Sequence, residues 1–410
     1  MKLEGITKNE VRMNKQMKIL FLCRSLHIGG VEKNLLLLTE EFKKKGHWIG
    51  VGAAPGIVAE MMQAKGAIYY EYSFSVKKPW TLLNDIKKLL NIFYHNEIDI
   101  IHSFSAASSV VVLFTRLIFK ILYRKSGKKM PTSVSSVMGL QGSPSELEIV
   151  THIRNLLVTL GAQRVFIISP EIGRMCYKLP LKKSLFKKLP VVGIRIPDSG
   201  NVSEKEKQDF KEKYGIALGA KVVSTIGRLD TEKSHDLFIR AASLIISKSE
   251  NIQFIIAGKG RLKESLDDLI KELNLNSRVK LIGATTEVNL LLAISDVYVK
   301  PGVVNGFIGI TVLEAQAMRI PVVAFDTVDV RIAITPGSTG VLVNAGDIGQ
   351  LSEAIINIIE KPEEYADIVI AARQKVEAYF SIIQVAEGLL NAYSEEMALS
   401  EYNNLYKLLK

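Results

Sequence analysis

The chain has 410 residues, 48% of them hydrophobic, and this length is typical of about two domains rather than of a single core. Its cysteines, Cys23 and Cys176, are too few for a disulfide-rich secreted scaffold, so the composition favours a reducing, cytoplasmic compartment. The formal net charge is +11, and residues 1–198 hold about 30 basic against about 14 acidic residues, which favours an anionic partner for that half.

The first predicted domain, residues 17–198, follows a polar tail at residues 1–16 that lacks the apolar core of a signal peptide. Short apolar strands alternate with amphipathic helices, beginning with a strand at residues 17–23, a turn of sequence SLHIGG and a helix at residues 31–46. Further strands are expected at residues 47–55, 98–105, 131–139 and 164–169. This alternation predicts a parallel sheet covered by helices on both faces.

The most apolar helical segment, residues 108–125, is interrupted by Arg116 and Lys120, which lie one helical turn apart. No segment reaches the ~20 uninterrupted apolar residues that a membrane span needs. Two interpretations stay open: a core helix with a solvated basic edge, or a helix that lies on a membrane surface.

A polar stretch at residues 197–206, PDSGNVSEKE, is the predicted linker. The second predicted domain, residues 199–380, restarts the pattern with the strand-and-turn units AKVVSTIGR, NIQFIIAGKG, RVKLIG, DVYVKPG and IPVVAFD. The predicted fold class is therefore α/β, with two doubly wound, Rossmann-like domains that face each other across a deep cleft. A ligand is expected in that cleft, at the carboxyl ends of the strands. Residues 381–410 predict one or two amphipathic helices.

Two stretches of the second domain carry residues suited to a phosphorylated ligand. Gly227 opens the turn GRLDTEKS, in which Arg228 and Lys233 lie near the start of a predicted helix. Two cations in that position suit a diphosphate, although a basic turn with a solvated lysine would have the same pattern. Glu314 is the one acid in KPGVVNGFIGITVLEAQA, and a buried carboxylate there needs a partner.

In their order along the chain, GRLDTEKS, FIIAGKG, RVKLIG, GITVLEAQA and IPVVAFD resemble motifs of the retaining nucleotide-sugar glycosyltransferases of group 1 (GT4), which have the GT-B fold. MKILFLCRSLHIGGVEKNLLLL resembles that family's opening strand, Gly-Gly turn and first helix, and IDIIHSFS resembles a later strand. The resemblance implies a hexosyltransferase that uses a UDP- or GDP-sugar and needs no metal or other cofactor. It also implies that residues 381–410 cross back to the first domain.

The resemblance implies a role for each matching position. Arg228 and Lys233 would be the catalytic pair that neutralises the donor diphosphate, and Glu314 would bind the ribose hydroxyls. The other donor-binding positions would mainly supply backbone amides: Gly227, Gly306, Phe307, Ile308, Gly309, Ile310 and Thr311. The residues expected on the acceptor side of the cleft are His27, Gly29, Gly30, His102 and Met138. For His102, a hydrogen-bonded structural role is the open alternative.

The chain departs from the family pattern at two of these positions. Gly306 stands where an acid commonly holds the donor sugar, and Met138 stands where a histidine is common. A non-catalytic GT-B protein that binds nucleotide sugars is therefore the alternative hypothesis. A nucleotide-sugar epimerase would not share GRLDTEKS and LEAQA. Nucleic-acid binding would rest on charge alone, so no nucleic-acid partner is expected.

The expected acceptor is a glycan or a lipid-linked sugar in the synthesis of a cell-surface polysaccharide or glycolipid. The basic N-terminal half predicts a cytoplasmic protein that contacts the anionic inner face of the cell membrane peripherally. Ordinary solubilising charge is the alternative. The cations expected at this contact are Arg124, Lys125, Lys128, Lys129, Lys182, Lys183, Lys187 and Lys188.

Overall fold

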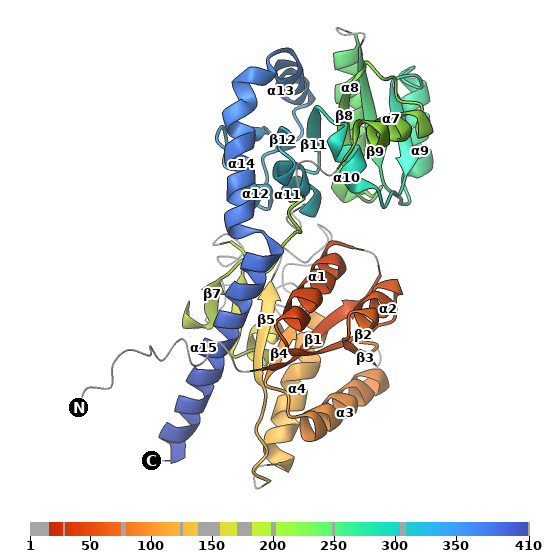
Figure 1. Ribbon diagram of the computed structural model, residues 1–410. Helices are drawn as coiled ribbons and strands as arrows, with labels where there is room; N and C mark the ends of the chain where they lie inside the picture. The colour runs from red at the N-terminus through yellow and green to blue at the C-terminus, as the bar shows by residue number, and fades with distance from the viewer. Residues whose placement is uncertain are drawn as a thin grey trace, which may run out of the picture. The chain divides into compact units, whose positions relative to one another are not determined.

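The computed structural model describes residues 16–27, 29–74, 79–123, 126–137, 156–169, 183–197, 202–247, 251–303 and 309–408. The chain forms two compact units (Figure 1). Unit 1 consists of Met1–Gly193 together with Ile382–Lys410, and unit 2 consists of Ile194–Ser381. The chain therefore passes between the units a few residues from the predicted boundaries at 198/199 and 380/381.

Unit 1 is built on a seven-stranded sheet with the order β3-β2-β1-β4-β5-β6-β7, in which every pairing is parallel. β1 pairs with both β2 and β4, so the strand order reverses at β1, as in doubly wound folds. The strands are β1 (Lys18–Ser25), β2 (Trp48–Ala54), β3 (Ile68–Glu71), β4 (Ile100–Ser103), β5 (Thr132–Val137), β6 (Arg164–Ile167) and β7 (Phe186–Lys188).

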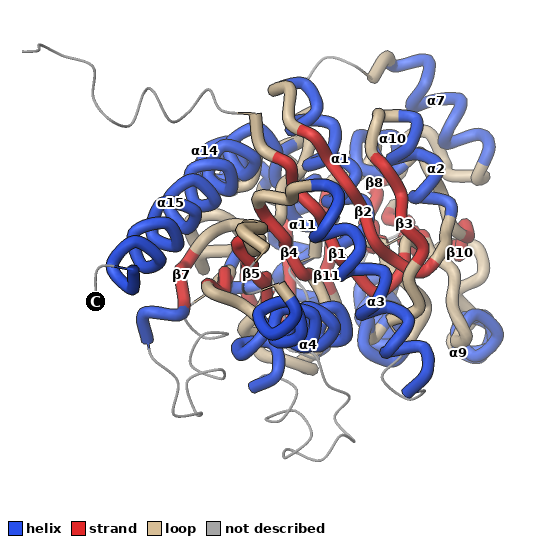
Figure 2. Tube along the Cα trace, turned by 90° about the horizontal axis from the view of Figure 1, so that it is seen from below, coloured by secondary structure: helices blue, strands red, loops and turns tan. Residues whose placement is uncertain are grey.

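The helices of unit 1 cover this sheet because each has an apolar stripe. In α1 the fully buried Leu35, Leu38 and Phe42 recur at helical spacing, so one face of the helix packs on the sheet. Figure 2 shows β1, β2 and β3 side by side, with the last helix, α15, beside the opposite edge strand β7. The helices are α1 (Gly30–Lys44), α2 (Ile57–Ala64), α3 (Pro79–Asn96), α4 (Ala106–Leu122) and α15 (Ile382–Leu408), with a short 3₁₀ turn η1 (Lys183–Leu185) before β7.

The C-terminal helix α15 is held on unit 1 by both apolar and charged contacts. Leu389, Ala392 and Tyr393 are fully buried. The acids of α15 pair with basic residues of the N-terminal segment: Lys45 with Glu387 (3.2 Å), Arg164 with Glu396 (2.7 Å), Lys129 with Glu401 (2.8 Å) and Lys187 with Glu395. Part of the positive charge of the N-terminal half is therefore neutralised within unit 1 itself.

Unit 2 repeats the doubly wound design on a six-stranded parallel sheet with the order β10-β9-β8-β11-β12-β13. The order reverses between the central neighbours β8 and β11, so the loops that follow these strands diverge and leave room for a ligand. The strands are β8 (Lys221–Ile226), β9 (Ile252–Ala257), β10 (Val279–Gly283), β11 (Val297–Lys300), β12 (Val322–Phe325) and β13 (Val341–Val343).

The largest core cluster of unit 2 lies between the sheet and the helices that pack on it. Phe254, Val299 and Phe325 contribute from the strands, and Phe238 and Ile355 contribute from α8 and α13. Helical elements of unit 2 are α7 (Glu204–Lys213), η2 (Thr231–Lys233), α8 (His235–Ile246), α9 (Lys263–Glu272), α10 (Val288–Ala293), α11 (Ile310–Ala317), α12 (Val330–Ala333), α13 (Ile348–Glu360), η3 (Pro362–Tyr365) and α14 (Ala366–Tyr379). The two doubly wound α/β units predicted from the sequence are thus confirmed.

Candidate functional site

The loop that follows β8 lies directly against the loop that follows β9. The Gly227 amide donates to the Ala257 carbonyl (3.0 Å), and the Leu229 amide donates to the Lys259 carbonyl (3.0 Å). A Cβ atom added to Gly258 would lie only 1.8 Å from the Gly227 carbonyl oxygen. Glycine is therefore needed at this contact, because any side chain would push the two loops apart.

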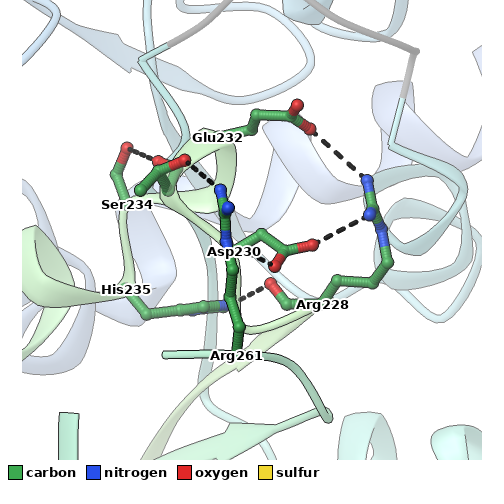
Figure 3. A network of polar contacts seen from close by, with 7 residues as sticks. Arg228, Asp230, Glu232, Ser234, His235 and Arg261 are labelled. Carbon is green, nitrogen blue, oxygen red and sulfur yellow. Dashed lines mark hydrogen bonds and ion pairs between the residues drawn. The ribbon is translucent and has the colours of Figure 1, made fainter. Parts of the chain in front are cut away.

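Arg228 lies at the rim of this loop, where two acids hold its guanidinium (Figure 3). It donates to Asp230 (2.8 Å) and to Glu232 (3.4 Å), and its side chain is 66% exposed. Arg261 from the neighbouring loop also pairs with Asp230 (3.5 Å). The Asp230 carboxylate thus orders two guanidinium groups on one side of the loop.

Lys233 is the last residue of η2, and Ser234 turns the chain into α8 from a left-handed conformation (φ 50°). The Lys233 side chain is half-buried, and no carboxylate among the described residues forms an ion pair with its ammonium. Its pKa lies below the ordinary value for lysine, because burial disfavours the charge and because Lys300 and Arg228 repel it. A half-buried ammonium with a second ammonium beside it is suited to bind an anion.

A second charged pair, which the sequence analysis did not predict, lies at the end of β11. The Lys300 ammonium is 3.0 Å from the Asp329 carboxylate, and both residues are buried. The Thr327 hydroxyl donates to the other carboxylate oxygen of Asp329 (2.7 Å). A lysine at the end of an apolar strand is the sequence signal for Lys300, whereas its pairing with Asp329 depends on the order of the strands.

Glu314 lies in the second turn of α11 and is only 6% exposed. It raises the pKa of the Tyr298 hydroxyl, for which burial is the main cause, so the two groups are close enough to interact. That hydroxyl is hydrogen-bonded to Thr311 (2.6 Å), in the first turn of the same helix. Strand β11 and helix α11 therefore place Glu314 and Thr311 together.

The structure brings most of the predicted donor-binding residues to one end of the unit 2 sheet. Gly302, after β11, approaches η2 so closely that an added Cβ would lie 3.0 Å from the Glu232 carbonyl oxygen. Gly309 and Ile310 begin α11, and Lys300 lies against Gly309. The loop residues Gly306, Phe307 and Ile308 lie outside the described residues.

His235 follows this turn in the sequence, and its side chain contacts the backbone of the turn. Its Nε2 is 3.2 Å from the Arg228 carbonyl oxygen (Figure 3), and burial lowers the pKa of its imidazole to about 4. The ring is therefore neutral at pH 7 and serves to hold the loop. In the part of the chain that the structure describes, no group of three or more His, Cys, Asp or Glu residues is placed to hold a metal ion.

Three of the predicted acceptor-side residues lie around the turn after β1. Gly29 precedes α1, Gly30 begins it, and His27 is exposed. The sequence analysis missed Glu32 in the first turn of α1: an added Cβ on Gly29 would lie 2.4 Å from its carboxylate. Burial raises the pKa of Glu32, and the nearby His27 opposes that shift.

His102 does not lie at a surface of unit 1, so its assignment to the acceptor side is wrong. The residue is fully buried, with Nδ1 2.6 Å from the Tyr393 hydroxyl and Nε2 2.5 Å from the Ser136 hydroxyl. Burial lowers the pKa of its imidazole to about 3, and Phe104 stacks on the ring. His102 therefore joins β4, β5 and α15 in the core. Met138 lies outside the described residues.

Known proteins resemble this chain in sequence and in fold. Residues 206–375 match the family model "Glycosyl transferases group 1". A GDP-mannose-dependent monoacylated alpha-(1-6)-phosphatidylinositol monomannoside mannosyltransferase of Corynebacterium glutamicum is 29% identical over 219 residues, which is 52% of this chain and 56% of that protein. The putative glycosyltransferase EpsD of Bacillus subtilis is 22% identical over 87% of this chain and 91% of its own length.

Among solved structures, that of Anabaena HepE in complex with UDP superimposes with a TM-score of 0.78 at 19% identity, over 92% of this chain and all of that one. A glycosyltransferase from Rickettsia africae gives a TM-score of 0.79 at 18% identity, over 93% of this chain and 99% of that one. The likeness therefore extends through both units, whereas the family model matches unit 2. Residues 206–375, within unit 2, thus match the group 1 glycosyl transferases, and the chain as a whole has the GT-B fold.

Proposed function

We propose that the chain is a retaining glycosyltransferase that transfers a hexosyl group from a UDP- or GDP-sugar to a glycan or a lipid-linked acceptor. The observation that carries this proposal is the half-buried Lys233 ammonium, which has no ion-pair partner among the described residues and lies beside Lys300 where β8 and β11 end. A polyvalent anion such as a diphosphate would neutralise the repulsion between the two ammonium groups.

The proposed reaction breaks the bond between the sugar C1 and the oxygen of the donor phosphate. The bonding electron pair goes to that phosphate oxygen, the acceptor hydroxyl bonds to C1, and the hydroxyl proton goes to the departing phosphate. Lys233 and Arg228 would stabilise the negative charge that develops on the leaving diphosphate, and no metal is required in this scheme. Arg228 would first exchange one of its exposed contacts, to Asp230 or Glu232, for the phosphate.

The nucleoside would lie against the start of α11. The buried Glu314 would accept hydrogen bonds from the ribose hydroxyls. Gly309 is the N-cap of α11, and the amides of Ile310 and Thr311 lie in its first turn, where backbone N–H groups have no helical partner and favour an anion.

Relatives support a nucleotide-sugar donor without naming it for this chain. HepE has been solved with UDP and with UDP-glucose, and the mannosyltransferase of C. glutamicum is named as GDP-mannose-dependent. That mannosyltransferase acts on a phosphatidylinositol mannoside, as its name states, and this supports a lipid-linked acceptor here.

The test is a donor screen followed by a transfer assay. UDP or GDP is expected to raise the melting temperature of the chain, and the effect should be lost in Lys233→Ala and weakened in Glu314→Ala. Lys271→Ala is the matched control, because Lys271 is an exposed lysine of the same unit, paired with Asp268. Radiolabelled hexose should then pass to an acceptor. Donor binding without transfer or hydrolysis, across UDP- and GDP-hexoses, would show the non-catalytic alternative to be correct.

We also propose that the protein is cytoplasmic and contacts an anionic membrane peripherally. Among the described residues, none of the helices is long and apolar enough to cross a membrane. Helix α4 nevertheless exposes Leu117 (49%) and Ile121 (77%), one helical turn apart, with the exposed Lys120 beside them. An apolar stripe with a lysine at its edge suits the interface of an anionic bilayer.

The cations predicted for this contact are only partly available. Lys129 and Lys187 pair with acids of α15, whereas Lys128 and Lys188 are exposed. Arg124, Lys125 and Lys182 lie outside the described residues, as does the side chain of Lys183. Ile121→Ser should therefore reduce the fraction of protein that sediments with vesicles containing anionic lipid more than Lys129→Ser does. Equal binding of Ile121→Ser and the unmodified chain would reject α4 as the contact.

A further inference from the structure

Lys300 is a buried cation that the stability of the sheet does not explain. It is 9% exposed and ends β11, whose other residues, Val297–Val299, are buried and apolar or aromatic. Removing two charges from water costs several kcal/mol for each ion, and a well-packed apolar pair of the same volume is often at least as stable as a buried ion pair. The Lys300–Asp329 pair therefore calls for a role other than stability.

The acidic side chains near Lys300 form ion pairs with some of the neighbouring cations and not with others. Asp329 pairs with Lys300, and both Asp230 and Glu232 pair with Arg228. Lys233 has no such partner among the described residues, and Lys300 is the cation that lowers its pKa most. Two ammonium groups that repel each other in a half-buried setting would both gain from the same anion.

The course of the Lys300 side chain places its ammonium beside the proposed donor site. A Cβ added to Gly309 would lie 3.6 Å from both Cδ and Cε of Lys300, so the lysine runs beneath the first turn of α11. The 3₁₀ turn η2, which carries Lys233, is also near: Gly302, two residues after Lys300, approaches the Glu232 carbonyl, and the two ammonium groups interact electrostatically. Lys300 therefore lies near both elements to which the diphosphate and the ribose are assigned.

We propose that Lys300 is a third cation of the donor site, which binds the diphosphate together with Lys233, and that Asp329 orients it and opposes that binding electrostatically. This inference rests on the proposed function, because it takes the ligand to be a nucleoside diphosphate. Asp329 holds the lysine chain in place through one oxygen and is itself held by Thr327 through the other. Its negative charge also repels the diphosphate, so it sets how tightly the leaving group is held.

The test compares substitutions at the two ends of the pair by titrating each folded variant with UDP and GDP. Lys300→Met should weaken binding of the better nucleotide at least about tenfold, and Lys300→Arg should restore part of the loss. Asp329→Asn should tighten binding several-fold, because it removes a negative charge and keeps an acceptor oxygen for Lys300. Lys271→Met is the matched control and should leave the affinity unchanged.

The decisive result is weaker nucleotide binding by Lys300→Met together with tighter nucleotide binding by Asp329→Asn. A purely structural pair would give weaker binding in both variants, or unchanged affinity in both, and either outcome would overturn the proposal. If Lys300→Met does not fold, the double variant Lys300→Met with Asp329→Leu keeps an apolar pair at the site. It should bind the nucleotide more weakly than Asp329→Asn does, because both lack the acid and only the double variant also lacks the lysine.

The failure of this inference is distinguishable from the failure of the proposed function. Normal affinity in folded Lys300→Met, beside lost affinity in Lys233→Ala, would reject the role of Lys300 alone. Absence of UDP and GDP binding to the unmodified chain would reject the proposed function itself.

Discussion

Among single residues, the glycines of the loops after β8 and β9 determine how closely these two loops approach at the proposed donor site. Gly258 and Gly260 allow two backbone segments to touch: their added Cβ atoms would lie 1.8 Å from the Gly227 oxygen and 2.3 Å from the Leu229 oxygen. These loops carry Arg228 and Arg261, so the backbone contact fixes the positions from which both arginine side chains extend.

Gly258→Ala should therefore lower both stability and nucleotide affinity. The added methyl group has only backbone to displace, so the expected loss in the free energy of unfolding is about 1–3 kcal/mol. Gly219→Ala is the matched control in the same unit, since an added Cβ there meets nothing within 4 Å. Calorimetry and UDP or GDP titration of both variants measure the difference. Equal melting temperatures would contradict the predicted clash.

His102 makes the stability of unit 1 dependent on pH. Its pKa is about 3 in the folded chain, below the ordinary value of about 6.5, because burial disfavours the charged ring. Between these two pKa values, the His102 side chain binds a proton in the unfolded chain and does not bind one in the folded chain. The free energy of unfolding therefore falls as the pH falls below about 6.5. Trp48 and Trp80, the two tryptophans of the chain, both belong to unit 1 and report its unfolding.

Urea unfolding followed by tryptophan fluorescence at pH 7, 6 and 5 should thus show a loss of stability that is smaller in His102→Asn. The variant is also expected to be less stable at pH 7, because the Tyr393 and Ser136 hydroxyls lose a buried partner. An unchanged slope against pH in the variant would remove His102 as the cause.

Local patterns in the sequence identify only some of the charged residues near the proposed site. Arg228, Lys233 and Glu314 could be singled out because a turn before a helix and an acid in an apolar segment are local patterns. Lys300 and Asp329 could not be paired in the same way, because their contact depends on the parallel pairing of β11 with β12. His102 was misassigned because the burial of a strand residue depends on what covers the strand, and here α15 covers it.

At the scale of the elements, the strands and helices were largely predictable, since each is a short apolar run followed by an amphipathic segment. The predicted strands at residues 98–105 and 164–169 contain β4 and β6. The predicted linker at residues 197–206 was partly wrong, because α7 begins within it at Glu204. The missed signal is a capping box: Ser203 accepts from the Glu206 amide, and the Glu206 carboxylate accepts from the Ser203 amide.

The ion pairs that attach α15 to unit 1 differ in burial, and they should therefore differ in their contribution to stability. The Arg164–Glu396 pair is the most buried of the charged contacts that hold the helix, with Glu396 at 5% exposure. Glu396→Ala leaves Arg164 without that partner in a half-buried site, so a loss of about 1–3 kcal/mol is expected. Glu395→Ala is the control, because its partner Lys187 and its own side chain are more exposed. Urea unfolding of both variants, read by tryptophan fluorescence, should separate them, and equal losses would contradict the ranking by burial.

At the scale of the whole molecule, donor binding and the integrity of unit 1 should be separable. Every described residue assigned to the nucleotide lies within Ile194–Ser381, whereas α15 packs on unit 1. A chain that ends at Ser381 loses Leu389, Ala392 and Tyr393 from the core of unit 1. It should therefore show an early tryptophan transition in urea and still bind UDP or GDP through unit 2. Loss of nucleotide binding, with unit 2 folded by circular dichroism, would contradict this separation.

The two places where the chain passes between units lie side by side. The Ile194 amide donates to the Phe380 carbonyl (2.8 Å), Ile194 and Ser381 form a parallel bridge, and an added Cβ on Gly193 would lie 2.9 Å from the Ile382 Cα. Unit 2 is thus inserted into the sequence of unit 1, and the first and last residues of the insertion lie next to each other. Recombination at these two adjacent positions would exchange the whole of unit 2, with the proposed nucleotide site, and would leave the sheet of unit 1 unbroken.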